Sequence, residues 1–459
     1  MSVVARSWGH LTPAGKVVVP LLGIVLALGL VAFLGIVTGI LPAIGDTVVL
    51  TGRRNVGIVR FLVAATAALL ASVPIAFINI YLEMKLLAWI ALRRGPNRVG
   101  PFGTLQSVAH GFKVLAKEDF TPTGADRAVF TIAPVVTFLS VVLAFMVVPF
   151  APGIVGVDMN IAVLFFFAIG GLTVVGLLAG GWASFNKYSL LGGLRSAAQI
   201  ISYEIPLTLS VVGVVMLAGT MSLHGIVEAQ AGHFWNWFVF QQPLGFLVFF
   251  LAGTAEGNRT PFDLTEADSE IVAGFATEYS GMRYGFFYFA EYVNLFILSA
   301  VTAILFFGGW SAPVEIHQLA AWLGVAVPSF AIDPSQLGIG LLFLLALGPA
   351  LGTVLCAIPV ALLRTDWSLR RALAVGFVLF NVVAGGLVIA WAYLASEVVA
   401  GLFWFLGKTF FFVFVFVWMR ATLPRVRIDQ LMGFAWKWLL PASLFNIFAT
   451  AAAIVLVNR

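Results

Sequence analysis

Eleven apolar stretches, most of them long enough to cross a lipid bilayer, constrain the fold of this chain more than any other feature. A transmembrane helix needs about twenty consecutive, predominantly apolar residues. Lipid offers the backbone no hydrogen-bond partner, so such segments form helices unless they close into a barrel, and the alternation typical of barrel strands is absent. We therefore predict an all-α polytopic membrane protein of about 11 transmembrane helices, at 18–41, 57–82, 129–150, 161–182, 201–220, 243–256, 284–309, 338–363, 372–395, 400–419 and 434–456.

The basic residues indicate how these helices are oriented. With the N-terminus inside, twenty Lys and Arg residues fall in cytoplasmic loops and only four fall outside. Cytoplasmic loops of membrane proteins carry such an excess of positive charge. We expect a multi-pass protein of the cell inner (plasma) membrane, with a cytoplasmic N-terminus and an external C-terminus. Membrane orientation also accounts for the net charge of +5 without a nucleic-acid partner.

A polar stretch between Lys85 and Glu118 holds a short amphipathic segment. It begins at Pro101, a residue favoured in the first helical turn. Lysines occupy one face, and the other face repeats apolar residues at helical spacing, namely Phe102, Leu105, Ala109, Phe112 and Ala116. This pattern predicts an interfacial helix in a cytoplasmic loop, lying flat on the membrane. A surface helix that packs on the bundle is the alternative.

Four glutamates lie in or at the ends of apolar stretches: Glu83, Glu204, Glu256 and Glu291. An ionisable group within a span costs roughly 2.5–3.5 kcal/mol on insertion scales, so it usually faces a polar cavity or a partner. A structural hydrogen-bonded pair near a helix end is the alternative. Lys408 is the sole cation inside a span and is a candidate partner for one of these acids.

The surroundings of Glu291 favour the cavity. Spaced at 100° per residue, several polar side chains share its helix face: Tyr284, Tyr288, Ser299 and Thr302. A polar stripe along a whole span predicts a hydrated path.

The second polar stretch, 257–280, is acidic. Asp263, Glu266 and Glu270 would share one face of a short helix starting near Thr265, with Asp268 turned away and Glu278 beyond it. A metal site is not expected, because no histidine is near and the spacing fits no calcium loop. The stretch is either a solvated acidic surface or a set of proton-sharing carboxylates. The single cysteine, Cys356, allows neither a disulfide within the chain nor an iron–sulfur cluster built from it.

Eight sequence motifs together resemble the H subunit of the proton-pumping NADH:quinone oxidoreductase, respiratory complex I. The resemblance covers 57–310 and 400–456 in unbroken order. The motifs are RRGPNRVGP (93–101), KED (117–119), GWASFNKYSLLGGLRSAAQIISYE (181–204), AEGNRTPFDLTEADSE (255–270), TEYSGM (277–282), AEY (290–292), FFGGW (306–310) and RATLPRVRIDQLM (420–432).

The resemblance implies a subunit without a redox centre that forms much of a quinone chamber. Quinone (ubiquinone or menaquinone) is then the substrate, and FMN and the iron–sulfur clusters belong to partner subunits. Implied partners are hydrophilic iron–sulfur and quinone-chamber subunits, together with antiporter-like and small membrane subunits. A line of carboxylates for proton or charge relay is implied at Glu204, Glu256, Glu291, Asp263, Glu266, Asp268, Glu270 and Glu278. The chamber and its mouth are implied at Glu83, Arg98, Arg420, Arg425, Arg427 and Asp429.

The family pattern also divides the chain. An eight-helix core at 57–310 and 400–459 is joined by an N-terminal extension with one further helix, 1–56, and an insert with two, 311–399. Three positions depart from the family: Met84 stands where Arg is usual, Asp268 replaces Glu, and Ile428 replaces an aromatic residue. These departures leave the quinone species open.

Two other functions are compatible with buried acids in a membrane domain. The equivalent subunit of an energy-converting hydrogenase or related dehydrogenase shares the fold, but the motifs GPNRVGP and RATLPRVRIDQLM favour the quinone enzyme. A stand-alone ion or solute transporter is the alternative from another class. Against it, the sequence has no inverted repeat with paired broken helices.

Overall fold

A computed structural model describes residues 56–263, 271–313 and 397–457. Within these ranges seven helices are long and apolar enough to cross a membrane, and one shorter helix is apolar as well. The described residues form no β-strand, only an isolated bridge between Ala151 and Ile154. The prediction of an all-α polytopic membrane protein is confirmed.

Eight of the predicted spans coincide with described helices, and the other three, 18–41, 338–363 and 372–395, lie outside the described residues. The long helices are α4 (Val56–Ile90), α6 (Arg127–Val147), α7 (Ala162–Ala183), α8 (Lys187–Ala218), α11 (Pro243–Glu256), α13 (Gly281–Phe306), α17 (Glu397–Thr422) and a last helix formed by α18 (Ile428–Phe434), the π-helical turn η4 (Ala435–Leu439) and α19 (Leu440–Val457). Short helices connect them: η1 (Pro101–Gly103), α5 (Gln106–Leu115), α9 (Leu223–Ala229), η2 (Phe234–Asn236), α10 (Phe238–Gln241) and η3 (Gly274–Ala276).

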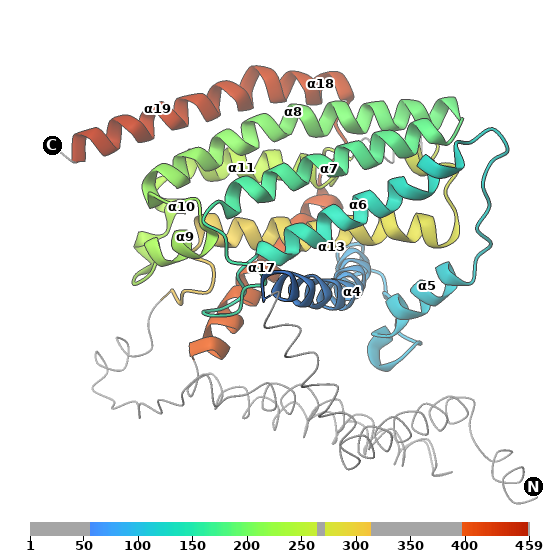
Figure 1. The fold of residues 1–459 in the computed structure, drawn as a ribbon, viewed down its shortest axis with the longest axis horizontal. Coiled ribbons are helices and arrows are strands. Elements are labelled where there is room, and N and C mark those ends of the chain that lie inside the picture. Colours follow the sequence, from blue (N-terminus) through green and yellow to red (C-terminus); the bar gives the residue numbers. More distant parts are fainter. Residues whose placement is uncertain (1–55, 264–270, 314–396, 458–459) are drawn as a thin grey trace, which may run out of the picture. The chain divides into compact units, whose positions relative to one another are not determined.

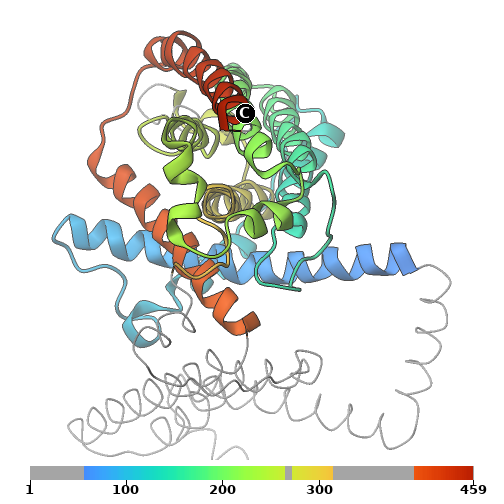
Figure 2. The ribbon, with the colours of Figure 1, turned by 90° about the vertical axis from the view of Figure 1, so that its left-hand side faces the viewer.

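The chain divides into two compact units, 1–60 with 328–400 and 61–327 with 401–459. The second unit holds nearly all of the described residues. In it α6, α7 and α8 pack side by side, and α13 lies against α6 (Figure 1). Figure 2, turned by 90°, shows α8 and α13 nearly end-on, with α4 running across them. Helix α4 therefore crosses this bundle at a steep angle.

Helix α13 is the central helix of the second unit. Every residue from Leu295 to Phe306 is buried. Lipid tails are as apolar as leucine, so close packing, rather than removal from water, holds membrane helices together. The neighbouring pair α7 and α8 illustrates this: a Cβ on Gly181 would lie 3.1 Å from the Cα of Gly193. The two backbones can approach this closely because both positions are glycine.

Helix α8 begins earlier than its hydropathy predicts, at Lys187 rather than near 201. Its N-cap residue Asn186 accepts a hydrogen bond from the backbone N of Tyr188 at 2.9 Å. Several polar residues inside the helix donate hydrogen bonds to other parts of the protein. For example, the Gln199 amide donates to the carbonyls of Ala255 at 2.7 Å and Phe262 at 2.8 Å. Hydropathy alone cannot locate the N-terminal end of α8, since it treats these polar side chains as if they faced lipid.

The predicted amphipathic helix is present but shorter: η1 is kinked at Phe102, whose φ is +55°, and the regular helix α5 begins only at Gln106. One side of α5 packs on α13, where a Cβ on Gly285 would lie 3.2 Å from Val114. The apolar side chains Phe102 and Phe112 are each 68% exposed. The helix thus combines a face packed on the bundle with an apolar face that the described chain leaves uncovered.

Candidate functional site

A tight turn after α11 places Arg259 inside the protein. Gly257 ends the helix with a hydrogen bond from its N to Gly253 O at 2.9 Å. Asn258 follows with φ +50°, in the left-handed region that asparagine enters more readily than most residues. The chain then turns back, and the backbone N of Arg259 donates to Thr254 O at 3.2 Å. The Arg259 side chain is only 3% exposed as a result.

Arg259 joins carboxylates from two helices that are far apart in the sequence. Its Nη1 donates to Glu83 Oε2 on α4 at 3.0 Å. Its Nη2 lies 3.2 Å from Glu291 Oε1 on α13, close enough for an ion pair but without the alignment of a hydrogen bond. Arg420 on α17 pairs with the other oxygen of Glu83. Two acids and two guanidiniums therefore form one charge-balanced network.

The network keeps Arg259 ionised. Burial alone would lower the pKa of its guanidinium, but the carboxylates of Glu291 and Glu83 raise that pKa above its ordinary value. The face of the Tyr292 ring, 4.8 Å from the guanidinium carbon, adds a cation–π contact. Asn79 braces this tyrosine from α4 by donating to its carbonyl at 3.1 Å. Removing one partner of a buried ion pair costs about 3–5 kcal/mol, so the network fixes α4, α13 and α17 relative to the turn after α11.

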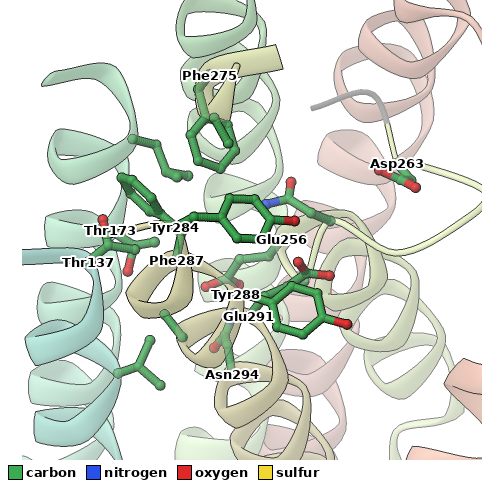
Figure 3. A pocket seen from close by; sticks show the side chains of 16 residues that line it. Thr137, Thr173, Glu256, Asp263, Phe275, Tyr284, Phe287, Tyr288, Glu291 and Asn294 are labelled. Carbon is green, nitrogen blue, oxygen red and sulfur yellow. The ribbon is translucent and has the colours of Figure 1, made fainter. Parts of the chain in front are cut away.

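A cavity whose walls combine apolar and polar side chains lies beside the network (Figure 3). Its empty volume is about 630 Å³, including its opening. Figure 3 shows Glu256 and Glu291 close to Tyr288, with Asp263 on the adjacent loop. The lining comes from α6, α7, η3, α13 and the end of α11; its polar members are Thr137, Thr173, Glu256, Asn258, Asp263, Tyr284, Tyr288, Glu291 and Asn294.

A second cavity of about 380 Å³ shares Glu256, Asn294 and Thr173 with the first. It adds Ser140, whose hydroxyl lies 2.7 Å from that of Thr173. The buried oxygen Oε2 of Glu256 has no hydrogen-bond partner among the described residues. Buried polar atoms of this kind usually bind ordered water. The two cavities together leave space around Glu256, bordered by both polar and apolar side chains, that reaches from α13 to α6 and α7.

Glu204 approaches the same region from α8. A Cβ on Gly171 of α7 would lie 3.8 Å from Glu204 Oε1, and one on the preceding Gly170 would lie 3.6 Å from Glu256 Oε1. The two carboxylates therefore contact α7 at consecutive residues. The structure thus brings together Glu256, Glu291 and Asp263 around one cavity, with Glu204 against the adjacent stretch of α7.

The segment after α17 lies against the turn that follows Arg259. Arg425 Nη2 pairs with Asp263 Oδ2 at 3.3 Å, and the N of Val426 donates to Pro261 O at 3.0 Å. The buried Tyr203 hydroxyl donates to Leu431 O at 2.8 Å. Asp263 itself is buried, while Arg425 is exposed at the surface.

The remaining predicted site residues lie elsewhere. Arg98, Arg427 and Asp429 are exposed on the surface. Glu278 accepts a hydrogen bond from Asn186 at 2.6 Å, beside the start of α8. Glu266, Asp268 and Glu270 lie outside the described residues.

Two interpretations of the sequence were wrong. Lys408 does not contact an acid in the described part of the chain; its Nζ donates to three backbone carbonyls near the end of α13. Of the polar stripe of α13, only Tyr284, Tyr288 and Glu291 line the first cavity; Ser299 and Thr302 are fully buried, and their hydroxyls bond to carbonyls of their own helix.

Sequence reasoning also missed residues. The loop-charge pattern gives Arg259 no role beyond that of a cytoplasmic charge, and no motif assigns a role to Asn294 or Thr173. Arg259 lies within the motif AEGNRTPFDLTEADSE, so its place between two acidic positions was the available signal. Its partners are 176 and 32 residues away, which no local pattern reveals.

Comparisons with known proteins agree with the family resemblance of these motifs. The sequence profile of a family described as NADH dehydrogenase matches residues 62–451. The chain is 42% identical over 400 residues to the H subunit of NADH-quinone oxidoreductase from Brevibacillus brevis, which covers 87% of this chain and 94% of that protein. The same-named proteins of Geobacillus kaustophilus and Dehalococcoides mccartyi are 43% identical over 387 residues and 41% identical over 379 residues. These matches cover 84% and 83% of this chain, and 91% and 82% of the two proteins.

Family membership confirms the resemblance found in the motifs. The relatives are subunits of an enzyme complex that uses NADH and quinone, so this chain has partner subunits in a membrane assembly. The chain belongs to the family of the NADH-quinone oxidoreductase H subunit and is a membrane subunit of that enzyme, complex I.

Proposed function

We propose that this subunit forms the quinone chamber of the enzyme and couples quinone reduction to proton translocation through its buried carboxylates. Hydrophilic partner subunits, which carry FMN and the iron–sulfur clusters, would close the chamber on the cytoplasmic side. Antiporter-like and small membrane subunits would receive the proton or charge signal at the far end of the carboxylate line.

The observation that carries this proposal is that one cavity is lined both by Asp263, on the loop, and by Glu256 and Glu291, within the bundle. Asp263 and Arg425 supply a carboxylate and a guanidinium next to apolar walls. Small-molecule sites usually combine mostly apolar walls with a few polar groups that fix orientation. A quinone ring offers two carbonyl oxygens as hydrogen-bond acceptors; the guanidinium of Arg425 can donate to them, and Asp263 can do so only when it is protonated.

Quinone reduction consumes protons, and the carboxylates are the groups that can deliver them. Reduction of a quinone to a quinol takes up two electrons and two protons. The electrons come from the partner subunits, and the protons must reach the ring through protein groups or water. Asp263 lies on the loop after Arg259, and its partner Arg425, exposed at the surface, compensates its charge.

The Arg259 network connects quinone reduction at the loop with the acids inside the helix bundle. Electron arrival adds negative charge near Asp263 and Arg425, and charge inside a low-dielectric region acts over longer distances than in water. Glu291 is held to Arg259 by an ion pair that lacks hydrogen-bond alignment, so its protonation and its position can respond to that charge. Glu256 lines the same cavity and is the next acid inward. Glu204, on α8, lies beyond it against α7.

The chamber is tested with Asp263→Asn and Arg425→Ala in the assembled complex. We expect the KM for quinone to rise about ten-fold, because Arg425→Ala removes a charged hydrogen-bond donor, whose bond contributes roughly 1.5–3 kcal/mol, and Asp263→Asn loosens the ion pair that holds this donor. Electron transfer from NADH to artificial acceptors upstream of quinone should be unchanged. Asp158→Asn, in an exposed loop between α6 and α7, is the matched control. Wild-type quinone kinetics in both variants, with only assembly reduced, would assign the pair to a subunit interface instead.

A further inference from the structure

Lys408 lies inside an apolar helix, α17, and its ammonium group is held by the backbone of another segment. Nζ donates to the carbonyls of Phe307 at 2.6 Å, Gly309 at 3.0 Å and Ser311 at 2.6 Å. A lysine ammonium has three N–H donors, so each is satisfied. The ring of Trp237, with its centroid 4.3 Å away, covers the ammonium as a cation–π partner.

These carbonyls belong to the turn that ends α13: Phe307 and Gly309 lie in the motif FFGGW, and Ser311 follows it directly. Gly308 and Gly309 have φ values of +68° and +48°, in the left-handed region that glycine favours. A Cβ on Gly308 would lie 2.4 Å from Ser311 Oγ and 2.8 Å from Trp237 Nε1. The turn therefore needs glycine there, and it directs three carbonyls toward Lys408. A cation at a helix C-terminus also complements the helix dipole.

Gln230 also holds this turn, through hydrogen bonds between its side chain and the backbone. Its side chain is fully buried, and its Oε1 accepts from the N of Gly308 at 3.0 Å and from the N of Phe238 at 3.2 Å. Its Nε2 donates to Ile304 O, within the last turn of α13, at 2.9 Å. The end of α13 is thus a rigid acceptor for Lys408.

The same two helices meet again at the ion-pair network. Helix α17 carries Arg420, twelve residues after Lys408, or about 18 Å along a helix. Helix α13 carries Glu291, sixteen residues before Phe307, or about 24 Å. Through Glu83 and Arg259, Arg420 and Glu291 belong to one network. Helices α13 and α17 are therefore linked at two separate points, by Lys408 at the end of α13 and by the network around Glu291 and Arg420.

We propose that Lys408 is a positioning residue, which holds the end of α13 against α17 and so sets the position of Glu291 relative to Arg259. Its ammonium takes no part in proton transfer itself. The consequence for pumping rests on the proposed function of Glu291, whereas the consequence for the position of α13 does not.

Lys408→Met removes the three donors and keeps a side chain of similar length, while Lys408→Arg keeps a cation with several donors. In the assembled complex, we expect Lys408→Met to lower quinone-coupled turnover about ten-fold, since misplacement of a reacting group by 1 Å can cost even more. Electron transfer to artificial acceptors should be unchanged, and Lys408→Arg should restore most of the turnover. Thr409→Val is the control, because the adjacent hydroxyl is buried and has no hydrogen-bond partner within the described ranges.

A double variant distinguishes an effect of Lys408 on the position of Glu291 from a general structural effect on the subunit. If Lys408 acts through Glu291, adding Lys408→Met to Glu291→Gln causes no further loss of proton translocation per electron. If Lys408→Met lowers proton translocation per electron by the same factor in the Glu291→Gln background as in the wild type, the proposal is overturned. Should Lys408→Met not assemble, Lys408→Gln, which keeps a donor, is compared in the same way.

A structure of the Lys408→Met complex distinguishes this proposal from the proposed function. An increased separation between Glu291 and Arg259, restored in Lys408→Arg, supports the positioning role even if Glu291→Gln pumps normally and the relay is refuted. An unchanged Glu291–Arg259 contact in Lys408→Met overturns the positioning role, whatever the relay does.

Discussion

Arg259 is the residue on which the buried site depends most, because it compensates carboxylates from α4 and α13 at once. Glu83, Glu256 and Glu291 could be predicted from the sequence, since an acid in an apolar stretch is conspicuous. Arg259 could not, because its role depends on partners that only folding brings near. The contacts of Lys408 were equally hidden, since its partners are backbone carbonyls, which every residue carries and no side-chain pattern marks.

At this scale we predict that Arg259→Met destabilises the subunit by about 3–5 kcal/mol, because Glu83 and Glu291 lose a buried counter-charge. Arg259→Lys should recover only part of the loss, since an ammonium cannot reach two carboxylates in the forked geometry of a guanidinium. Thermal denaturation of the detergent-solubilised complex and the yield of assembled enzyme measure the effect. Unchanged stability in Arg259→Met would show that the two acids are neutral or solvated.

At the scale of elements, the helices follow from hydropathy but their ends do not. Helix α8 begins at Lys187 because Asn186 caps it and its polar residues bond inside the bundle. The cavities are likewise invisible in the sequence, because they arise where α6, α7, α11 and α13 meet. Nothing local in α7 indicates that Gly170 and Gly171 adjoin two carboxylates.

The glycine pair of α7 gives an element-scale prediction. In Gly170→Ala the new methyl group lies 3.6 Å from Glu256 Oε1, an ordinary contact, and takes space that water can occupy. The helix itself should gain up to about 1 kcal/mol, because alanine is the better helix former. We therefore expect normal or slightly raised stability with slower proton translocation. Gly407→Ala on α17 is the control, since its Cβ meets nothing within 4 Å. Equal translocation rates in the two variants would contradict a role for the space beside Glu256.

For the whole molecule, composition and loop charge predicted the class of protein, and the family motifs predicted its enzyme complex. The orientation in the membrane is still a prediction, derived from twenty basic residues inside and four outside. The extra helices predicted at 18–41, 338–363 and 372–395 lie outside the described residues.

Orientation is tested by cysteine labelling in a Cys356→Ser background, which removes the only native cysteine. Gln241→Cys, exposed in the segment before α11, should react with an impermeant reagent added to the outer face. Lys113→Cys, exposed on α5, should react only after the membrane is opened. The reverse pattern would invert the topology and place the chamber on the other side.

The central claim is that Glu256 and Glu291 couple quinone reduction to proton movement, and the number of protons translocated per electron tests it most directly. The measurement uses sealed vesicles that oxidise NADH with quinone as acceptor. We predict a clearly lower ratio for Glu256→Gln and for Glu291→Gln, with electron transfer to artificial acceptors preserved. Glu228→Gln, an exposed acid on α9, should keep the wild-type ratio. A wild-type ratio in both Glu256→Gln and Glu291→Gln would contradict the account and leave these acids a structural role alone.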